Sequence, residues 1–150
     1  MQTRLVLAAA LLLGAIAPAT AAEVRLHALL DGASVVSATD SKATGEATAV
    51  LDDDNRLRLD LVFGGLDTGV TGAGLHVGTA AENGPEAEPL DVRKTQTEGS
   101  LVQARFTLTD DVAARMRAGE TYISIETVDH PAGAIRGQLV PQPVRLDYTP

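Results

Sequence analysis

The sequence of 150 residues contains no cysteine and no tryptophan, and it has only two phenylalanines and two tyrosines. Without cysteine, the chain has no disulfide framework, no thiolate nucleophile and no site for a lipid-modified N-terminus. So few aromatic rings leave little material for a platform on which sugars or bases could stack. The fold must therefore be stabilised by an apolar core, and the chain is long enough to bury one.

Basic residues are also scarce. The chain has 12 Lys and Arg against 20 Asp and Glu, a formal charge of −8 at pH 7. Such an excess of acid repels phosphate backbones and anionic lipid head groups. The composition therefore predicts a soluble domain with no nucleic-acid partner and no affinity for a membrane surface.

The N-terminus carries a long apolar run, LVLAAALLLGAIA at residues 5–17. It follows a single positive charge, Arg4, and precedes a small-x-small site at 19–21, which is the pattern of a secretory signal peptide. The run is too short to span a bilayer comfortably, so a membrane anchor is less favoured. We expect a signal peptide over residues 1–21, a periplasmic or secreted mature chain, and no membrane insertion after cleavage.

Alternation of apolar and polar residues dominates the remaining sequence and predicts β-strands. The clearest case is RLRLDLVF at residues 56–63, which reads as a half-buried antiparallel strand with its leucines inward. Further strands are predicted at residues 23–30, 43–51, 73–78, 100–108, 121–127 and 134–141, with an edge pairing at 89–94. A polar loop is expected over 79–89. In the strand at 100–108, the alternation predicts that Val102, Ala104, Phe106 and Leu108 face the core.

One segment, TDDVAARMRAGE at residues 109–120, has a helical pattern. Thr109 or Asp110 can cap its start, and Gly119 can end it. Seven to eight short strands separated by Gly, Pro and Asp turns predict an all-β, antiparallel, Greek-key-like β-sandwich or barrel with one short helix. We assign this β domain to residues 22–141 and a tail to 142–150.

The chain resembles the CHRD domain, the module named for chordin and found in many secreted bacterial proteins. The resemblance covers roughly residues 27–140, and its most specific part is AGETYISIETVDHPAGAIRGQL. The residues that carry this part are Gly119, Tyr122, Pro131, Gly133, Arg136, Gly137 and Gln138. The resemblance implies an all-β extracytoplasmic module without established catalytic activity, which acts in interaction or structure.

Two positions differ from what the resemblance implies. Members commonly show a His-x-His pair where this chain has Gly74-Leu75-His76, so only His76 matches. They also commonly have a histidine at the position of Glu126. A metal role for these positions is therefore weakened in this chain.

Three residues are candidate metal ligands. If their strands pair, His76 and Glu126 can meet across the sheet, and His130 in the following turn is a third candidate. Imidazole and carboxylate groups bind zinc and copper, but structural zinc uses four ligands. A hydrogen-bonded His-Glu pair that only stabilises the sheet is the favoured interpretation, and zinc or copper binding is the alternative.

Arg136 is the other notable polar residue, and we expect it in a structural polar cluster with Tyr122, Glu126 and Gln138. A carboxylate such as Glu126 or Glu46 would be its bidentate partner. An anion-binding arginine is the alternative.

No catalytic group is apparent. The sequence lacks a Gly-x-Ser-x-Gly elbow and a serine with an evident histidine partner, and three histidines are too few for a copper-zinc dismutase centre. We therefore predict a non-enzymatic binding or structural module without a cofactor. Its expected partner is an extracytoplasmic protein or a cell-envelope component. Open edge strands also allow a homo-oligomer.

Overall fold

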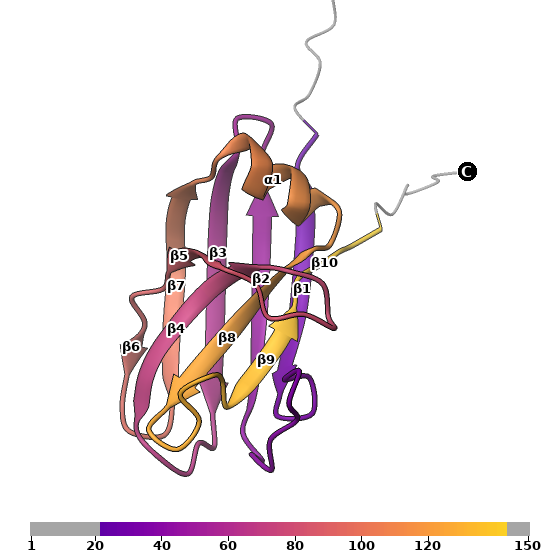
Figure 1. Cartoon of the computed structure of the whole chain (residues 1–150). Coiled ribbons are helices and arrows are strands. Elements are labelled where there is room, and N and C mark those ends of the chain that lie inside the picture. Colours follow the sequence, from indigo (N-terminus) through magenta and orange to yellow (C-terminus); the bar gives the residue numbers. More distant parts are fainter. Residues whose placement is uncertain (1–21, 144–150) are drawn as a thin grey trace, which may run out of the picture.

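The computed structural model describes residues 22–143; the expected signal peptide and the end of the tail, residues 144–150, lie outside the described residues. The fold is an all-β antiparallel curled sheet, a half-barrel, with one short helix (Figure 1). The elements, in chain order, are β1 (Val24–Asp31), β2 (Thr44–Leu51), β3 (Arg56–Gly64), β4 (Val70–Val77), β5 (Glu86–Pro89), β6 (Arg93–Lys94), β7 (Gly99–Thr107), α1 (Asp110–Arg117), β8 (Thr121–Thr127), β9 (Ile135–Gln138) and β10 (Val140–Pro141). The predicted all-β antiparallel class with one helix is confirmed.

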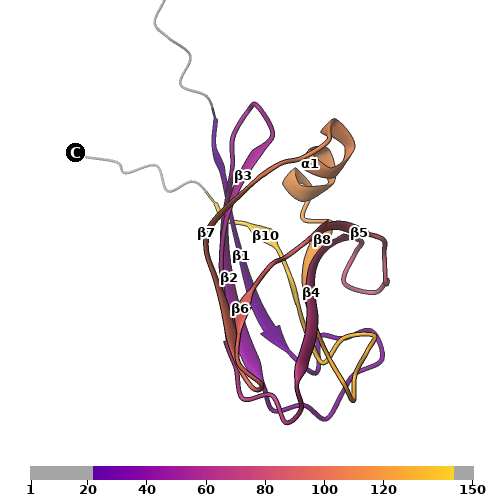
Figure 2. The same cartoon turned by 90° about the vertical axis from the view of Figure 1, so that its left-hand side faces the viewer.

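The strands follow the order β5-β4-β8-β9-β1-β2-β3-β7-β6, and β10 pairs with β1. The sheet curls so that two wings face each other as layers, which Figure 2 shows from the side. The first wing consists of β1, β2, β3, β7 and β6, and the second wing of β9, β8, β4 and β5. They join where Asp31 of β1 pairs with Arg136 of β9. Each wing thus has an inner face on the core and an outer face.

The inner faces supply the core, as the alternation predicts. Leu57, Leu59, Leu61 and Phe63 of β3 are all buried, while the residues between them are exposed. From the second wing, Leu75, Ile123 and Ile125 pack into the same cluster. Because strand residues alternate between faces, this one-sided burial leaves two outer faces free for polar groups.

One predicted inward residue, Val102 of β7, points to solvent instead and is 73% exposed. The pairing of β3 with β7 shifts between Leu59 and Leu61, so that Val102 and Gln103 both stand opposite Asp60. Gln103 has a φ of 51°, and its backbone N–H donates to Asp60 at 2.7 Å. This β-bulge adds one residue to β7 and moves the alternation by one position, which the sequence pattern does not show.

The predicted loop over residues 79–89 is also partly wrong, because its last four residues form β5 at the edge of the second wing. Their sequence, EAEP, lacks the apolar alternation by which strands are recognised. The sequence predicts seven to eight strands, and eight strands have four or more residues. Two further strands, β6 and β10, have only two residues each.

Helix α1 matches its prediction. The Thr109 side chain caps its first turn by accepting from the backbone N–H of Val112 at 3.4 Å, and Gly119 follows its end with a φ of 77°. Ala113 and Met116 are buried, so the helix covers one end of the space between the wings. No helix within residues 22–143 is long and apolar enough to cross a membrane.

Candidate functional site

A polar cluster lies on the outer face of the second wing. In the strand register, Tyr122 of β8 stands opposite His76 of β4 on one side and Gln138 of β9 on the other. Arg136 stands opposite Ser124, two pairs further along and therefore on the same face. Three of the four residues expected in this cluster, Tyr122, Arg136 and Gln138, therefore come together.

The Tyr122 ring is stacked by two neighbours. The guanidinium carbon of Arg136 lies 3.4 Å from the ring centroid, a cation–π contact. The imidazole of His76 lies parallel to the same ring, with 5.0 Å between centroids and 10° between planes. Because β4 and β9 flank β8, the two contacts come from the strands on either side of Tyr122.

The cluster binds the β4–β5 loop, residues 78–85, which folds over this outer face. Arg136 donates from Nη2 to the carbonyl of Thr79 at 2.6 Å and from Nη1 to that of Glu82 at 2.8 Å. The hydroxyl of Tyr122 accepts from the backbone N–H of Gly84 at 2.9 Å. Gln138 donates to the carbonyl of Gly78 at 2.8 Å. An irregular loop lacks the backbone partners that a strand would have, and the side chains of the cluster supply hydrogen bonds in their place.

The prediction that Arg136 pairs with a carboxylate is wrong. Arg136 is only 2% exposed, and its acceptors are loop carbonyls and the side-chain oxygens of Asn83 and Gln138, with no carboxylate in ion-pair distance among residues 22–143. Glu46 lies on the first wing and accepts from His27 at 2.8 Å. Burial lowers the pKa of Arg136, and the neighbouring Tyr122 opposes that shift. An arginine nevertheless stays charged at neutral pH, so carbonyl dipoles and the aromatic ring stabilise the charge.

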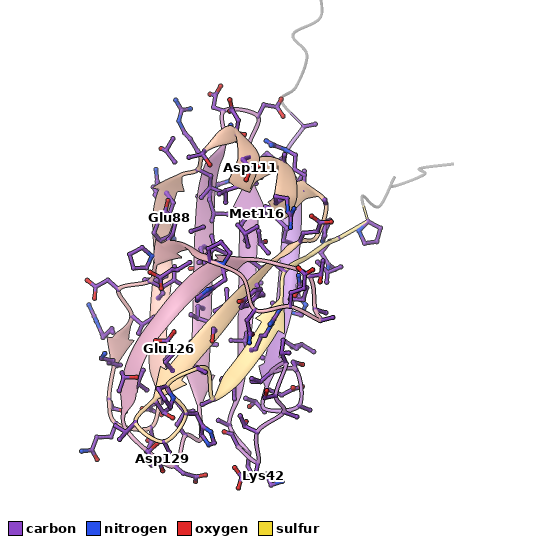
Figure 3. All side chains as sticks on the ribbon, viewed as in Figure 1. Lys42, Glu88, Asp111, Met116, Glu126 and Asp129 are labelled. Carbon is purple, nitrogen blue, oxygen red and sulfur yellow. The ribbon has the colours of Figure 1, made fainter. Side chains whose placement is uncertain are left out.

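Glu126 does not belong to the cluster, and its predicted pairing with His76 is also wrong. Glu126 stands opposite Gly72, four positions along the strands from the His76–Tyr122 pair, a distance of about 13 Å. Its carboxylate lies over Gly72. Figure 3 shows Glu126 toward the end of the second wing that is remote from the helix.

His130 lies apart from both residues, in the turn between β8 and β9, where its Nε2 is 3.7 Å from the carboxylate of Asp40. The three candidate ligands are therefore not brought together. Within residues 22–143, no three His, Cys, Asp or Glu side chains gather in a way that could hold a metal ion.

The residue beside His76 is Glu86 of β5, which sequence reasoning missed because it fell in the predicted loop. A carboxylate oxygen of Glu86 and Nε2 of His76 lie 2.5 and 2.8 Å from the point where a Cβ on Gly74 would stand. That Nε2 is buried and has no hydrogen-bond partner among the described residues, while Nδ1 is 3.2 Å from the carbonyl oxygen of Gly84. Glycine at position 74 leaves the space that these groups occupy.

The sequence also did not show that the outward residues of the first wing form one continuous surface. It carries exposed side chains from strands far apart in the sequence, among them Arg25, Arg58 and Arg105. The alternation shows each arginine pointing away from the core, but only the strand order makes them neighbours.

A family comparison agrees with the resemblance. The model of the CHRD domain matches residues 26–139, which is most of the chain and includes the polar cluster and all of the first wing except the first two residues of β1. No curated protein and no solved structure shows a significant match. The chain belongs to the CHRD domain family.

Proposed function

We propose that this chain is a non-enzymatic binding module that acts outside the cytoplasm by protein–protein interaction. The expected signal peptide supports a periplasmic or secreted location. The polar cluster supports a non-catalytic role, because its side chains are used in holding the β4–β5 loop. The proposed partner is an extracytoplasmic protein or a cell-envelope component. A second copy of this chain is one such protein.

One observation carries this proposal: exposed apolar side chains gather on the outer face of the first wing. Six large hydrophobic residues are strongly exposed within residues 22–143; three of them are on this face, and a fourth lies beside it on β10, which pairs with β1. These four are Leu29 at 65%, Val62 at 57%, Val102 at 73% and Val140 at 50% exposed. Apolar side chains gathered on one face mark interaction surfaces, whereas scattered ones need no explanation.

Val62→Glu is expected to weaken capture of the partner about tenfold or more, because a charge would be buried at the centre of the contact. The mature chain is immobilised and exposed to envelope and culture fractions of its native cells, and bound proteins are quantified by mass spectrometry. Val128→Glu is the matched control, since Val128 is 66% exposed but lies in the turn after β8. Equal capture by Val62→Glu and wild type, or no reproducible capture, would contradict the proposal.

Metal binding at His76 is a second candidate function, and the unpartnered Nε2 beside Glu86 favours it. Imidazole and carboxylate are ligands of zinc and copper. With two protein ligands, water would have to complete the coordination, so the expected affinity is low. Neither Glu126 nor His130 belongs to this set.

His76→Ala is expected to abolish binding of one Zn²⁺ or Cu²⁺ per chain, whereas His130→Ala should leave it unchanged. Isothermal titration of the purified mature chain with each metal measures this directly. A wild-type chain that binds neither metal, or a His76→Ala variant that binds as well as wild type, would refute the candidate.

A further inference from the structure

The outer face of the first wing is basic in an acidic protein. Its outward side chains include five arginines and three acids, and a fourth acid, Glu23, contacts it from the start of the described chain; the whole chain has 12 basic and 20 acidic residues. The arginines are Arg25, Arg56, Arg58, Arg93 and Arg105, and the acids of the strands are Asp31, Glu46 and Asp60. The charge of the chain is thus segregated, and most of the acids lie elsewhere.

Three of these arginines form a row across four strands. Arg25 of β1 pairs with Val50 of β2, Val50 with Arg58 of β3, and Arg58 with Arg105 of β7. We call Arg25, Arg58 and Arg105 the arginine row; it spans about 14 Å at the usual strand spacing. A cleft of about 370 Å³ lies beside it, lined in part by Arg58 and Arg105.

This arrangement is unfavourable for the isolated chain. Like charges directly opposite each other on a sheet destabilise it, and Arg58 and Arg105 are such a pair. The three acids on the strands of the face do not relieve the repulsion, because Asp31 accepts from the backbone of Ser34, Glu46 is engaged by His27 and Asp60 by the backbone of Gln103. Arg25 and Arg105 form no ion pair with any residue between 22 and 143.

A carboxylate already contacts the row. Glu23, at the start of the described chain, places an oxygen 3.3 Å from Nη2 of Arg58 and lines the same cleft. Both partners are about half exposed, so this contact is weak and can be exchanged for another carboxylate. Arginine forks match carboxylates in geometry, and they bind them more strongly when water is excluded.

The apolar residues of the face lie within reach of the row. Leu29 and Val62 belong to one cross-strand row, four residues further along β1 and β3, at about 13 Å. A partner segment that follows the strands for about five residues can contact the arginines at one end and the apolar side chains at the other. Charged contacts would then set its register, and apolar contacts would add affinity.

We propose that the arginine row binds an acidic segment of a partner protein whose neighbouring residues are apolar. This inference rests on the proposed binding function and names the chemistry of the partner. A phosphate polymer fits less well, because the row is short and flanked by apolar side chains. The acidic remainder of the chain would also repel a long polyanion.

The test uses the mature chain and a fluorescent peptide with a run of glutamates followed by valines and leucine. We expect anisotropy titrations to show binding that weakens about tenfold or more in Arg58→Gln/Arg105→Gln. The matched control is Lys42→Gln/Lys94→Gln, which changes the net charge equally. Lys42 lies at the end of the molecule opposite the helix (Figure 3), and Lys94 lies on edge strand β6. This control variant should bind the peptide as tightly as wild type does.

Thermal unfolding separates binding from folding in the same variants. Because the substitution removes a like-charge pair, Arg58→Gln/Arg105→Gln should melt no lower than wild type, so weaker binding cannot result from unfolding. A peptide with glutamines in place of the glutamates should not bind to wild type.

Several outcomes would overturn the inference: no binding of the acidic peptide, equal binding by the arginine variant, or tighter binding of duplex DNA or phosphatidylglycerol vesicles than of the peptide. These results differ from a failure of the proposed function. If Val62→Glu loses the native partner while Arg58→Gln/Arg105→Gln keeps it, the face is an interface but the arginine row is not its acidic-segment site.

Discussion

Replacing Arg136 with methionine is expected to lower the free energy of unfolding by about 3 kcal/mol. Methionine keeps much of the apolar stem but removes the guanidinium that donates to Thr79 and Glu82 and lies over Tyr122. The loop carbonyls then lose their charged donor in a position where strand pairing cannot replace it. The β4–β5 loop should detach from the outer face of the second wing.

Urea denaturation followed by circular dichroism measures this loss. Arg136→Lys should fall between methionine and wild type, because an ammonium group keeps the charge but lacks the planar fork that reaches several carbonyls at once. Arg93→Met, at an exposed position of β6, should change stability by less than about 0.5 kcal/mol. A loss of under 1 kcal/mol for Arg136→Met would show that the loop is held by other contacts.

Gly84→Ala is expected to destabilise the protein by about 2 kcal/mol. A Cβ at this position would overlap the carbonyl oxygen of Val77 and approach its carbonyl carbon to 2.7 Å. Both are backbone atoms of β4 and its end, so no change of rotamer can make room. Displacing Gly84 would also break its bonds with the Tyr122 hydroxyl.

Gly69→Ala is the control for the general cost of replacing a glycine. The nearest atom to a Cβ there is a methyl carbon of Val128 at 3.9 Å, an ordinary contact. Its unfolding midpoint in urea should match wild type closely. If Gly84→Ala also unfolds like wild type, the loop can shift without loss, and its close packing on β4 contributes little.

The double variant Arg136→Met/Gly84→Ala tests whether the two residues act on the same structure. Because each substitution alone releases the β4–β5 loop, their effects should not add, and the double variant should be little less stable than the worse single one. Limited proteolysis should cut all three variants within residues 78–85 faster than wild type.

Local patterns were sufficient where a residue's environment depends on its sequence neighbours. The leucines of β3 face the core because strand side chains alternate, and helix α1 lies between Thr109 and Gly119 because its capping groups are local. The predictions that failed depend on partners elsewhere. Val102 turns outward because β7 acquires a bulge against β3, and β5 forms because β4 offers it an edge.

The same distinction applies to the candidate site. The sequence identified Tyr122, Arg136 and Gln138 as a group, since alternate positions in two strands of one hairpin share a face. The sequence could not identify the acceptors of Arg136, because most of them are backbone carbonyls. Every residue has a carbonyl, so no sequence pattern distinguishes the ones that accept. Nor could it exclude the His76–Glu126 pair, since a change in strand register moves every cross-strand neighbour.

The CHRD family, the all-β class, the helix and the inward or outward direction of most strand residues could be recognised from the order of residues alone. These follow from the order of residues and from the period of two along a strand. Which outward residues meet depends on the folded sheet, which brings Arg58 to Arg105, His76 to Tyr122, and Arg136 to the β4–β5 loop. Strand order and register bring these residues together, and both depend on how the whole sheet curls around its core.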